Sequence, residues 1–300
     1  MNNNIYFAAI DIGSNAVRLT VKNIEKDPID NSETLAHDLL IRFPLRLGDD
    51  AFSWGKISRE TEKHLLYLMK SFQQMLKIFS VIDCKVCATS AMRDATNGQK
   101  VADKIYKKTG INIEIIDGEE EARIIYETHI ERDLGQENNY MYMDVGGGST
   151  QISLIYSGNL IYSHSFNIGT VRMMNNKVNP NEKEAFFTQL QELRKQYPDF
   201  QLVGSGGNIN KLYNLLQVKK DRSTMSVEKL KQLYKELSQL SVEMRMKQYR
   251  IKRDRAEVIG FAADIFIEAA DAMQIEYLIV PSISISDGII NRMFLKYVNA

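Results

Sequence analysis

The sequence predicts a mixed α/β protein made of two related lobes, and two observations carry this prediction. A short apolar segment, 5–10, runs into the polar turn Asp11-Ile12-Gly13-Ser14-Asn15. A near copy follows in the second half, where the apolar segment 140–145 contains Asp144 and leads into Gly146-Gly147-Gly148-Ser149. Helical segments follow each copy in a chain of 300 residues. Each half is therefore expected to form one lobe, with a ligand in the cleft between them.

The first half is expected to start with a β-meander and to continue with alternating helices and strands. After the first strand, residues 16–21 alternate and are rich in β-branched side chains, and 33–47 are expected to add a third strand. Apolar residues at helical spacing predict a long helix over 57–79, with Ser58 as its N-cap. The remaining expected elements are a strand near 84–88, a helix near 98–109, a strand near 112–116 and a helix from about Glu119.

The second half is expected to contain a hairpin after its glycine turn and then mostly helices. Ser157-Gly158-Asn159 is typical of a hairpin turn. Asn179 followed by Pro180 predicts a helix start. A buried strand over 200–203 is expected to end at a third glycine-rich turn, Gly204-Ser205-Gly206-Gly207. Further expected elements are helices near 226–247, 254–273 and 288–298 and a strand at 277–280.

Charge and composition exclude several classes of protein. The 38 Lys and Arg residues balance 38 Asp and Glu residues, which argues against a globally basic nucleic-acid binder and against an acidic disordered chain. No apolar run approaches the roughly 18 residues of a membrane span, and the first residues have no basic region of a signal peptide. We therefore expect a cytoplasmic protein with neither nucleic acid nor membrane as a partner.

The two cysteines form a Cys-x-x-Cys pattern at Cys84 and Cys87. One interpretation is a redox or metal pair. The other is two buried residues of a strand, whose side chains point to opposite faces because they are three residues apart. No second Cys or His pair completes a zinc site, so the pattern favours the strand.

Three glycine-rich turns directly after strands are candidate phosphate sites. Glycine lets backbone N–H groups approach an anion closely, and successive N–H groups form a nest for phosphate oxygens. A single turn of this kind is as often a plain hairpin or cap. Neither of the first two turns fits the P-loop pattern, and no dinucleotide fingerprint follows the first strand. Two of the turns, however, carry an Asp two positions before the first glycine, and such an Asp can hold hydrated Mg²⁺ against a phosphate. The capping alternative is stronger for Asp11 than for Asp144.

A set of motifs resembles a known family. They are Asp11–Asn15, Arg46-Leu-Gly-Asp49, Ala88–Ala95 with Asn97, Gly118–Arg123, Asp144–Ser149, Gly169-Thr-Val-Arg172 and Gly204–Gly207. In this order, over almost the whole chain, they resemble the exopolyphosphatase / guanosine pentaphosphate phosphohydrolase (Ppx/GppA) family. That family is part of the actin, Hsp70 and sugar-kinase superfamily.

The resemblance implies a fold and an activity. The fold is two ribonuclease-H-like (actin-like ATPase) lobes with the active site in the interlobe cleft. Lobe I is expected over 1–125, completed by the C-terminal helix 288–300, and lobe II over 126–287. The implied activity releases terminal phosphate from inorganic polyphosphate, guanosine pentaphosphate or both, with Mg²⁺ or another divalent cation. A sugar-kinase-like phosphotransferase and a non-catalytic alarmone sensor are the alternatives. Homodimers are common in the family.

The resemblance also assigns roles to residues. Glu121 is the implied catalytic base, although the run Glu119-Glu120-Glu121 leaves Glu120 as an alternative. The implied metal ligands are Asp144, Glu121 and Asp11. The implied phosphate-binding residues are Ser14, Asn15, Arg93, Gly146, Gly147, Gly148, Ser149, Gly206 and Gly207.

The chain departs from the family at its C-terminal end. The Arg of the family's Leu-Arg-Glu-Gly sequence is absent or displaced to Arg292. The chain is also expected to comprise the two-lobe core without the helical region that long members append. Basic residues crowd 245–255, which predicts either a solvated helix end or an electropositive lip for a polyanion, to which Lys219, Lys220 and Arg222 would add.

Overall fold

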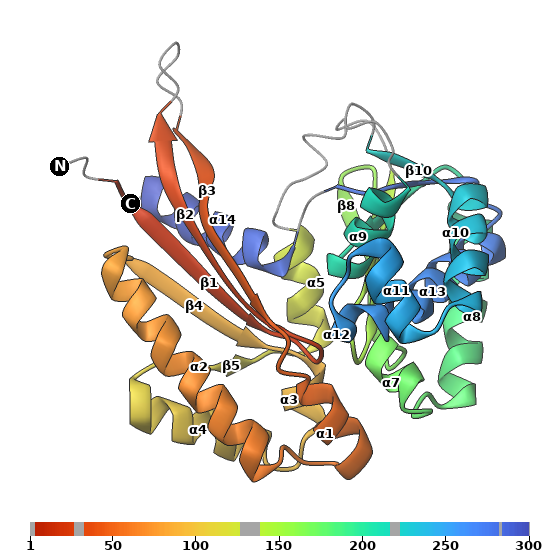
Figure 1. Ribbon diagram of the computed structural model, residues 1–300. Helices are drawn as coiled ribbons and strands as arrows, with labels where there is room; N and C mark the ends of the chain where they lie inside the picture. Colours follow the sequence, from red (N-terminus) through yellow and green to blue (C-terminus); the bar gives the residue numbers. More distant parts are fainter. Residues whose placement is uncertain (1–3, 27–32, 127–138, 217–222, 282–283, 300) are drawn as a thin grey trace. The chain divides into compact units, whose positions relative to one another are not determined.

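The computed structural model describes residues 4–26, 33–126, 139–216, 223–281 and 284–299 (Figure 1). The chain divides into two compact units. Unit 1 comprises residues 1–128 and 285–300, and unit 2 comprises residues 129–284. Each unit has its own β-sheet. Lys219, Lys220 and Arg222 lie outside the described residues.

The sheet of unit 1 has the strand order β3-β2-β1-β4-β5. The three strands β1 (Tyr6–Ile12), β2 (Val17–Lys26) and β3 (Glu33–Phe43) form an antiparallel meander. Strands β4 (Asp83–Ala88) and β5 (Glu114–Ile115) add to the other side of β1, both in the parallel direction. Strand β1 is buried almost throughout because helices cover both faces of the sheet, which explains its continuous apolar run.

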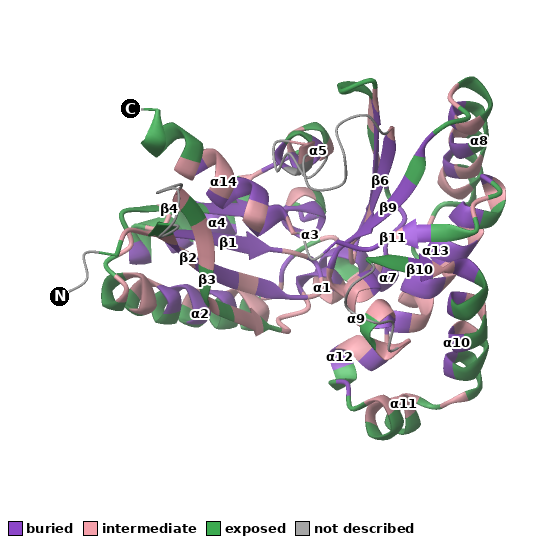
Figure 2. Cartoon of the chain, turned by 90° about the horizontal axis from the view of Figure 1, so that it is seen from above, coloured by how far each residue is buried: buried purple, intermediate pink, exposed green. Residues whose placement is uncertain are grey.

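Helices of unit 1 cover this sheet from both sides. Figure 2 shows α2 on one face and the C-terminal helix α14 on the other. Helix α2 is N-capped by Ser58, whose Oγ accepts a hydrogen bond from Thr61 N at 3.2 Å, as the sequence predicts. The helices are α1 (Leu47–Trp54), α2 (Arg59–Ile78), α3 (Ser90–Asp94), α4 (Gly98–Thr109), α5 (Gly118–Tyr126) and α14 (Ile285–Val298).

The sheet of unit 2 repeats the topology of unit 1. Its order is β10-β11-β9-β6-β7-β8, so β8-β7-β6-β9-β11 corresponds to β3-β2-β1-β4-β5, with β10 as an added antiparallel edge. This repeated order confirms the predicted duplication of a ribonuclease-H-like lobe. The strands are β6 (Tyr140–Val145), β7 (Thr150–Tyr156), β8 (Asn159–Phe166), β9 (Gln201–Ser205), β10 (Thr224–Ser226) and β11 (Tyr277–Ile279).

Helix α13 (Ile259–Ala272) forms the centre of the helical layer in unit 2, where it contacts α7, α8, α9, α10 and β6. It buries eight of its fourteen residues, which explains its apolar composition. The predicted start of α8 is confirmed, since Asn179 Oδ1 accepts a hydrogen bond from Asn181 N at 3.0 Å. The other helices are α7 (Thr170–Met174), α8 (Pro180–Gln196), α9 (Gly207–Leu215), α10 (Val227–Gln239), α11 (Val242–Tyr249) and α12 (Arg253–Ala256).

Three predicted elements are wrong in extent. The helix expected over 226–247 is two helices, because Leu240 is extended and the Ser241 side chain caps α11 by accepting from Met244 N. The helix expected over 254–273 is the short α12 followed by α13. The strand expected over 112–116 pairs only at Glu114 and Ile115, since its partner β4 ends at Ala88. The spacing of apolar residues does not reveal a serine that ends one helix and caps the next.

The cysteines are residues of β4, as the strand interpretation predicts. Both are free thiols. Burial is the main cause that raises the pKa of Cys84 and of Cys87, each to about 12, so neither forms a reactive thiolate near neutral pH. Among the described helices, none combines the length and apolar character needed to cross a bilayer.

Candidate active site

The first glycine turn connects β1 to β2 and is braced by two helices of unit 1. Gly13 N donates to Ala16 O at 3.1 Å and closes the turn. Helix α1 binds it from one side, because Gly48 N donates to Ser14 O at 2.8 Å. The Ser14 and Ser90 hydroxyls, both buried, lie 2.9 Å apart, so the start of α3 holds the other side. The predicted phosphate residue Ser14 is therefore fixed by contacts distant in sequence.

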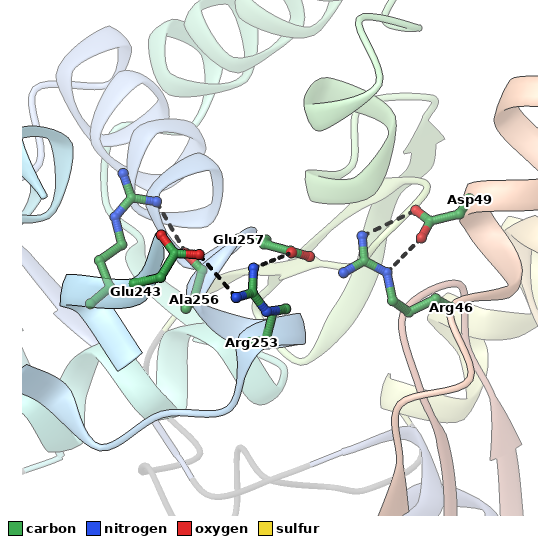
Figure 3. Close-up of polar contacts among 7 residues, drawn as sticks. Arg46, Asp49, Glu243, Arg253, Ala256 and Glu257 are labelled. Carbon is green, nitrogen blue, oxygen red and sulfur yellow. Dashed lines mark hydrogen bonds and ion pairs between the residues drawn. The ribbon is translucent and has the colours of Figure 1, made fainter. Parts of the chain in front are cut away.

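Asn15 has binding capacity left within the same turn. Its backbone oxygen accepts a hydrogen bond from Arg46 N at 3.2 Å. Its side-chain Oδ1 is buried without a hydrogen-bond partner among the described residues. The guanidinium of Arg46 is itself directed by Asp49, to which it donates from Nε at 2.6 Å and from Nη2 at 3.2 Å (Figure 3). The amide oxygen of Asn15 is therefore a buried acceptor of the turn without a hydrogen-bond partner among the described residues.

Asp11 already has a counter-ion within unit 1. It lies directly opposite Arg18 in the β1–β2 pair, and Arg18 Nη1 donates to Asp11 Oδ2 at 3.0 Å. Burial nevertheless outweighs this attraction and raises the pKa of Asp11. A metal at Asp11 would have to compete with Arg18.

Arg93 links α3 to the segment that precedes α5. It follows Ser90 by one helical turn, so both residues lie on the same side of α3. Arg93 Nη1 donates to Ile116 O at 2.9 Å. Arg93 Nε also lies 4.0 Å from Asp94 Oδ1. The guanidinium has five N–H donors, so these two partners still leave donors for a phosphate.

The three consecutive glutamates at the start of α5 have different environments. Glu119 is exposed. Glu120 accepts a hydrogen bond from Arg292 Nη1 at 2.7 Å and lies 3.2 Å from Arg123 Nη2. Glu121 is buried, with 9% of its surface exposed. Asp117 caps the turn by accepting from Glu120 N at 2.8 Å. Glu120 is therefore committed to two ion pairs, whereas Glu121 is buried.

Asp144 occupies the position in unit 2 that Asp11 occupies in unit 1. Its Oδ2 accepts a hydrogen bond from Ser205 Oγ at 2.8 Å, across the parallel β6–β9 pair. Its partner across the β6–β7 pair is Gln151, not an arginine. Gln151 is 4% exposed, and its Oε1 has no hydrogen-bond partner among the described residues. A Cβ on Gly206 would lie 3.0 Å from Asp144 Oδ1, so the third glycine turn lies directly against this carboxylate.

The second glycine turn, Gly146–Ser149, is held by α7. Gly146 N donates to Ser149 O at 2.9 Å. The carbonyl oxygens of the turn accept hydrogen bonds from Thr170 N, Val171 N and the Arg172 side chain. A Cβ on Gly169 would lie 2.4 Å from Gly148 C, so only glycine permits this approach. Because the carbonyl oxygens point to α7, the amides are the part of the turn that an anion can use.

The predicted site residues thus gather in two groups, each inside one unit. Unit 1 brings Ser14, Asn15 and Arg93 onto elements that contact one another, and unit 2 brings Asp144, Gly146–Ser149, Gly206 and Gly207 together. The predicted metal ligands are divided, with Asp11 and Glu121 in unit 1 and Asp144 in unit 2. Ser90 and Ser205 lie within motifs that the sequence analysis names, but it gives them no individual role, and it does not single out Gln151.

The donors around Asp144 fit a divalent cation of the Mg²⁺ type. Within the described ranges, no three His, Cys, Asp or Glu side chains gather as a metal cage. Mg²⁺ does not need one, since it keeps several waters and binds one or two carboxylates plus substrate phosphates. One carboxylate, one serine hydroxyl and the buried, unpartnered amide oxygen of Gln151 suit such a site.

The basic segment 245–255 is partly structural. Arg245 donates from Nε to Leu237 O and from Nη1 to Ala256 O. Arg253 binds Glu243 at 2.9 Å and lies 3.9 Å from Glu257 (Figure 3). Lys247, Arg250 and Lys252 are exposed.

Comparison with known proteins places this geometry in a family. A sequence model described as the Ppx/GppA phosphatase family matches residues 29–297. A guanosine-5'-triphosphate,3'-diphosphate pyrophosphatase of Aeromonas salmonicida is 24% identical over 302 residues, which cover 97% of this chain and 60% of that protein. Exopolyphosphatase 1 of Mycobacterium tuberculosis is 30% identical over 147 residues, 48% of this chain and 40% of that protein.

A solved structure extends the match to the whole chain. The crystal structure of the Aquifex aeolicus member of the Ppx/GppA family has 26% identity and a TM-score of 0.76, and the match covers 98% of this chain and 99% of that chain. By contrast, the chain spans no more than 60% of the length of the two curated relatives. With the family model matching most of the sequence, the chain belongs to the Ppx/GppA phosphatase family.

Proposed function

We propose that the protein is a phosphohydrolase that releases the terminal phosphate of inorganic polyphosphate, of guanosine pentaphosphate or of both. The observation that carries this proposal is the pair of equivalent turns, one at the end of the first strand of each duplicated sheet, in a chain of the Ppx/GppA phosphatase family. The family membership makes phosphoanhydrides the expected substrate class.

The glycine turns and Arg93 are proposed to bind phosphoryl oxygens. Hydrolysis of a terminal phosphate requires that the negative charge on these oxygens be offset and that a water be aligned with the phosphorus. In unit 1 the Ser14 hydroxyl and the Arg93 guanidinium supply donors for this purpose, and in unit 2 the amides of Gly147 and Gly148 do so.

Glu121 is proposed as the base that takes the proton of the attacking water. Glu120 is the weaker candidate because Arg292 and Arg123 both engage its carboxylate. Glu119 is exposed to solvent. General-base assistance is typically worth about 10²–10⁴ in rate.

A divalent cation is proposed to bind at Asp144 rather than at Asp11. Asp144 has an unpartnered amide oxygen opposite it, whereas Asp11 has Arg18. The cation, when bound, offsets charge on the transferred phosphoryl group. Asp144 is held for this role by the Ser205 hydroxyl.

A phosphate-release assay tests the proposal. The protein is incubated with long-chain polyphosphate, guanosine pentaphosphate and ATP, each with Mg²⁺ and with EDTA. We expect release from polyphosphate or guanosine pentaphosphate that EDTA abolishes, and little release from ATP. Tight guanosine pentaphosphate binding with no release from any substrate would leave a sensor and overturn the proposal. Phosphate transfer from ATP to a sugar would indicate a phosphotransferase instead.

A further inference from the structure

Two pairs of residues join α14 to α5 within unit 1. Arg292 Nη1 donates to Glu120 Oε1 at 2.7 Å. Four residues earlier on α14, a Cβ on Gly288 would lie 2.3 Å from the carbonyl oxygen of Ile124, so the two helices approach almost backbone to backbone. Residues four apart share one helix face. One face of α14, with Gly288 and Arg292, therefore meets one face of α5, with Ile124 and Glu120, in antiparallel order.

Helix α14 is in turn anchored to the sheet that carries the first glycine turn. It packs on β1, β2 and β4 and buries Ile289, Ile290 and Met293. At its start, Asp287 lies 2.7 Å from Lys22 Nζ on β2. The position of α14 is therefore fixed relative to β1, at whose end Ser14 lies.

The Arg292–Glu120 contact constrains the direction of Glu121. Successive residues of an α-helix are about 100° apart around its axis. A contact that holds Glu120 against α14 therefore fixes the rotation of α5 and, with it, the side to which Glu121 points. The cap by Asp117 stabilises the first turn but comes from the same segment, so it does not tie α5 to the sheet.

We propose that Arg292 is a positioning residue for the base Glu121. The proposal rests on the proposed function for its catalytic part, whereas its structural part concerns α5 alone. Arg123, the second cation near Glu120, does not share this role, because it belongs to α5 itself and its side chain is 61% exposed. Arg123 therefore provides a matched control.

The experiment compares Arg292→Met and Arg292→Lys with Arg123→Met in the full chain, with two readouts. The first is hydrogen–deuterium exchange of the amides of 117–126. The second is phosphate release, resolved into kcat and KM. In Arg292→Met we expect about tenfold faster exchange in α5. We also expect kcat to fall at least about tenfold with KM changed less than about threefold, because small displacements of a reacting group are costly. Arg292→Lys should recover part of both, and Arg123→Met should change neither.

The two readouts separate the failure of this proposal from the failure of the proposed function. Unchanged exchange in α5 of Arg292→Met overturns the positioning role whatever the substrate. Faster exchange with unchanged kcat overturns its link to catalysis. If the wild type has no activity, the proposed function fails while exchange still decides the structural part. Should Arg292→Met not fold, Glu120→Gln alters the same contact from the other side and is expected to reproduce the faster exchange in α5; unchanged exchange there would overturn the positioning role.

Discussion

Arg18 Nη1 donates a hydrogen bond to Asp11 Oδ2 at 3.0 Å, and the two residues lie opposite each other on β1 and β2. The equivalent pair in unit 2 is Asp144 and Gln151. The duplicated turns therefore differ at one functional point. The first carboxylate is matched by a cation of the protein, whereas the second faces a neutral amide whose oxygen lacks a partner among the described residues.

Replacing Arg18 with Met should destabilise unit 1 in a pH-dependent way. The pKa of Asp11 is already raised by burial, and loss of Arg18 raises it further. The folded state then holds the Asp11 proton more tightly than the unfolded state, so stability falls as pH rises from near 4 through the folded pKa. Breaking a partly buried ion pair of this kind is expected to cost about 2 kcal/mol at pH 8 and less at pH 4.5. Urea unfolding at both pH values measures the loss in the free energy of unfolding. The exposed Lys26→Met is the control, and equal losses at both pH values would contradict the mechanism.

Glutamine substitutions at the start of α5 should test Glu121 as the base. Glu121→Gln keeps the shape of the side chain but removes its basicity, so kcat should fall by about 10²–10⁴ while KM changes little. Glu119→Gln should resemble the wild type, because Glu119 is exposed. Steady-state phosphate release for the two variants tests the assignment of Glu121. Near-normal turnover in Glu121→Gln would remove the assignment.

An alanine at position 169 should disturb the second glycine turn. Its Cβ would meet the backbone of Gly147 and Gly148 at 2.4–2.5 Å, and backbone atoms cannot move aside cheaply. We expect a loss of about 3 kcal/mol and a raised KM for phosphate substrates. Gly260→Ala is the matched control, since an added Cβ there meets nothing within 4 Å and should stabilise α13 by up to about 1 kcal/mol. Thermal unfolding and KM are the measurements, and similar behaviour of both variants would refute the argument.

Local patterns predict much of this fold because local interactions determine it. The Ser58 cap and the β1–β2 turn depend on neighbouring residues, and so does the hairpin at Ser157 and Gly158, both of which have positive φ. The same local rule also predicts a feature that the sequence analysis missed, namely the residue that lies opposite each Asp. A tight turn after each Asp places the residue seven positions later opposite it, which gives Arg18 and Gln151 directly.

Contacts between distant segments could not be predicted in this way. Ser14 meets Ser90 and Asp144 meets Ser205 only because β1 and β6 each pair with a parallel strand that returns after a long connection. The Arg292–Glu120 contact likewise joins the two chain segments that make up unit 1. The sequence shows which residues are suited to phosphate chemistry, but only the folded sheet shows which of them are held in place by a partner.

Neutralising three exposed cations of the basic segment 245–255 should selectively weaken the binding of long polyphosphate. Lys247, Arg250 and Lys252 are exposed, whereas Arg245 is engaged by backbone carbonyls. In a variant with Lys247→Gln, Arg250→Asn and Lys252→Gln, KM for long chains should rise about tenfold, with a smaller change for short chains. Asn suits position 250 because φ there is +48°.

The control is a triple Lys→Gln variant at the exposed residues 100, 107 and 108 of α4, which removes the same charge from unit 1. Since screening by salt weakens exposed charges, the wild-type advantage should shrink at high ionic strength. An equal rise in KM in both variants, or a rise independent of salt and chain length, would show that the basic segment is only a solvated helix end.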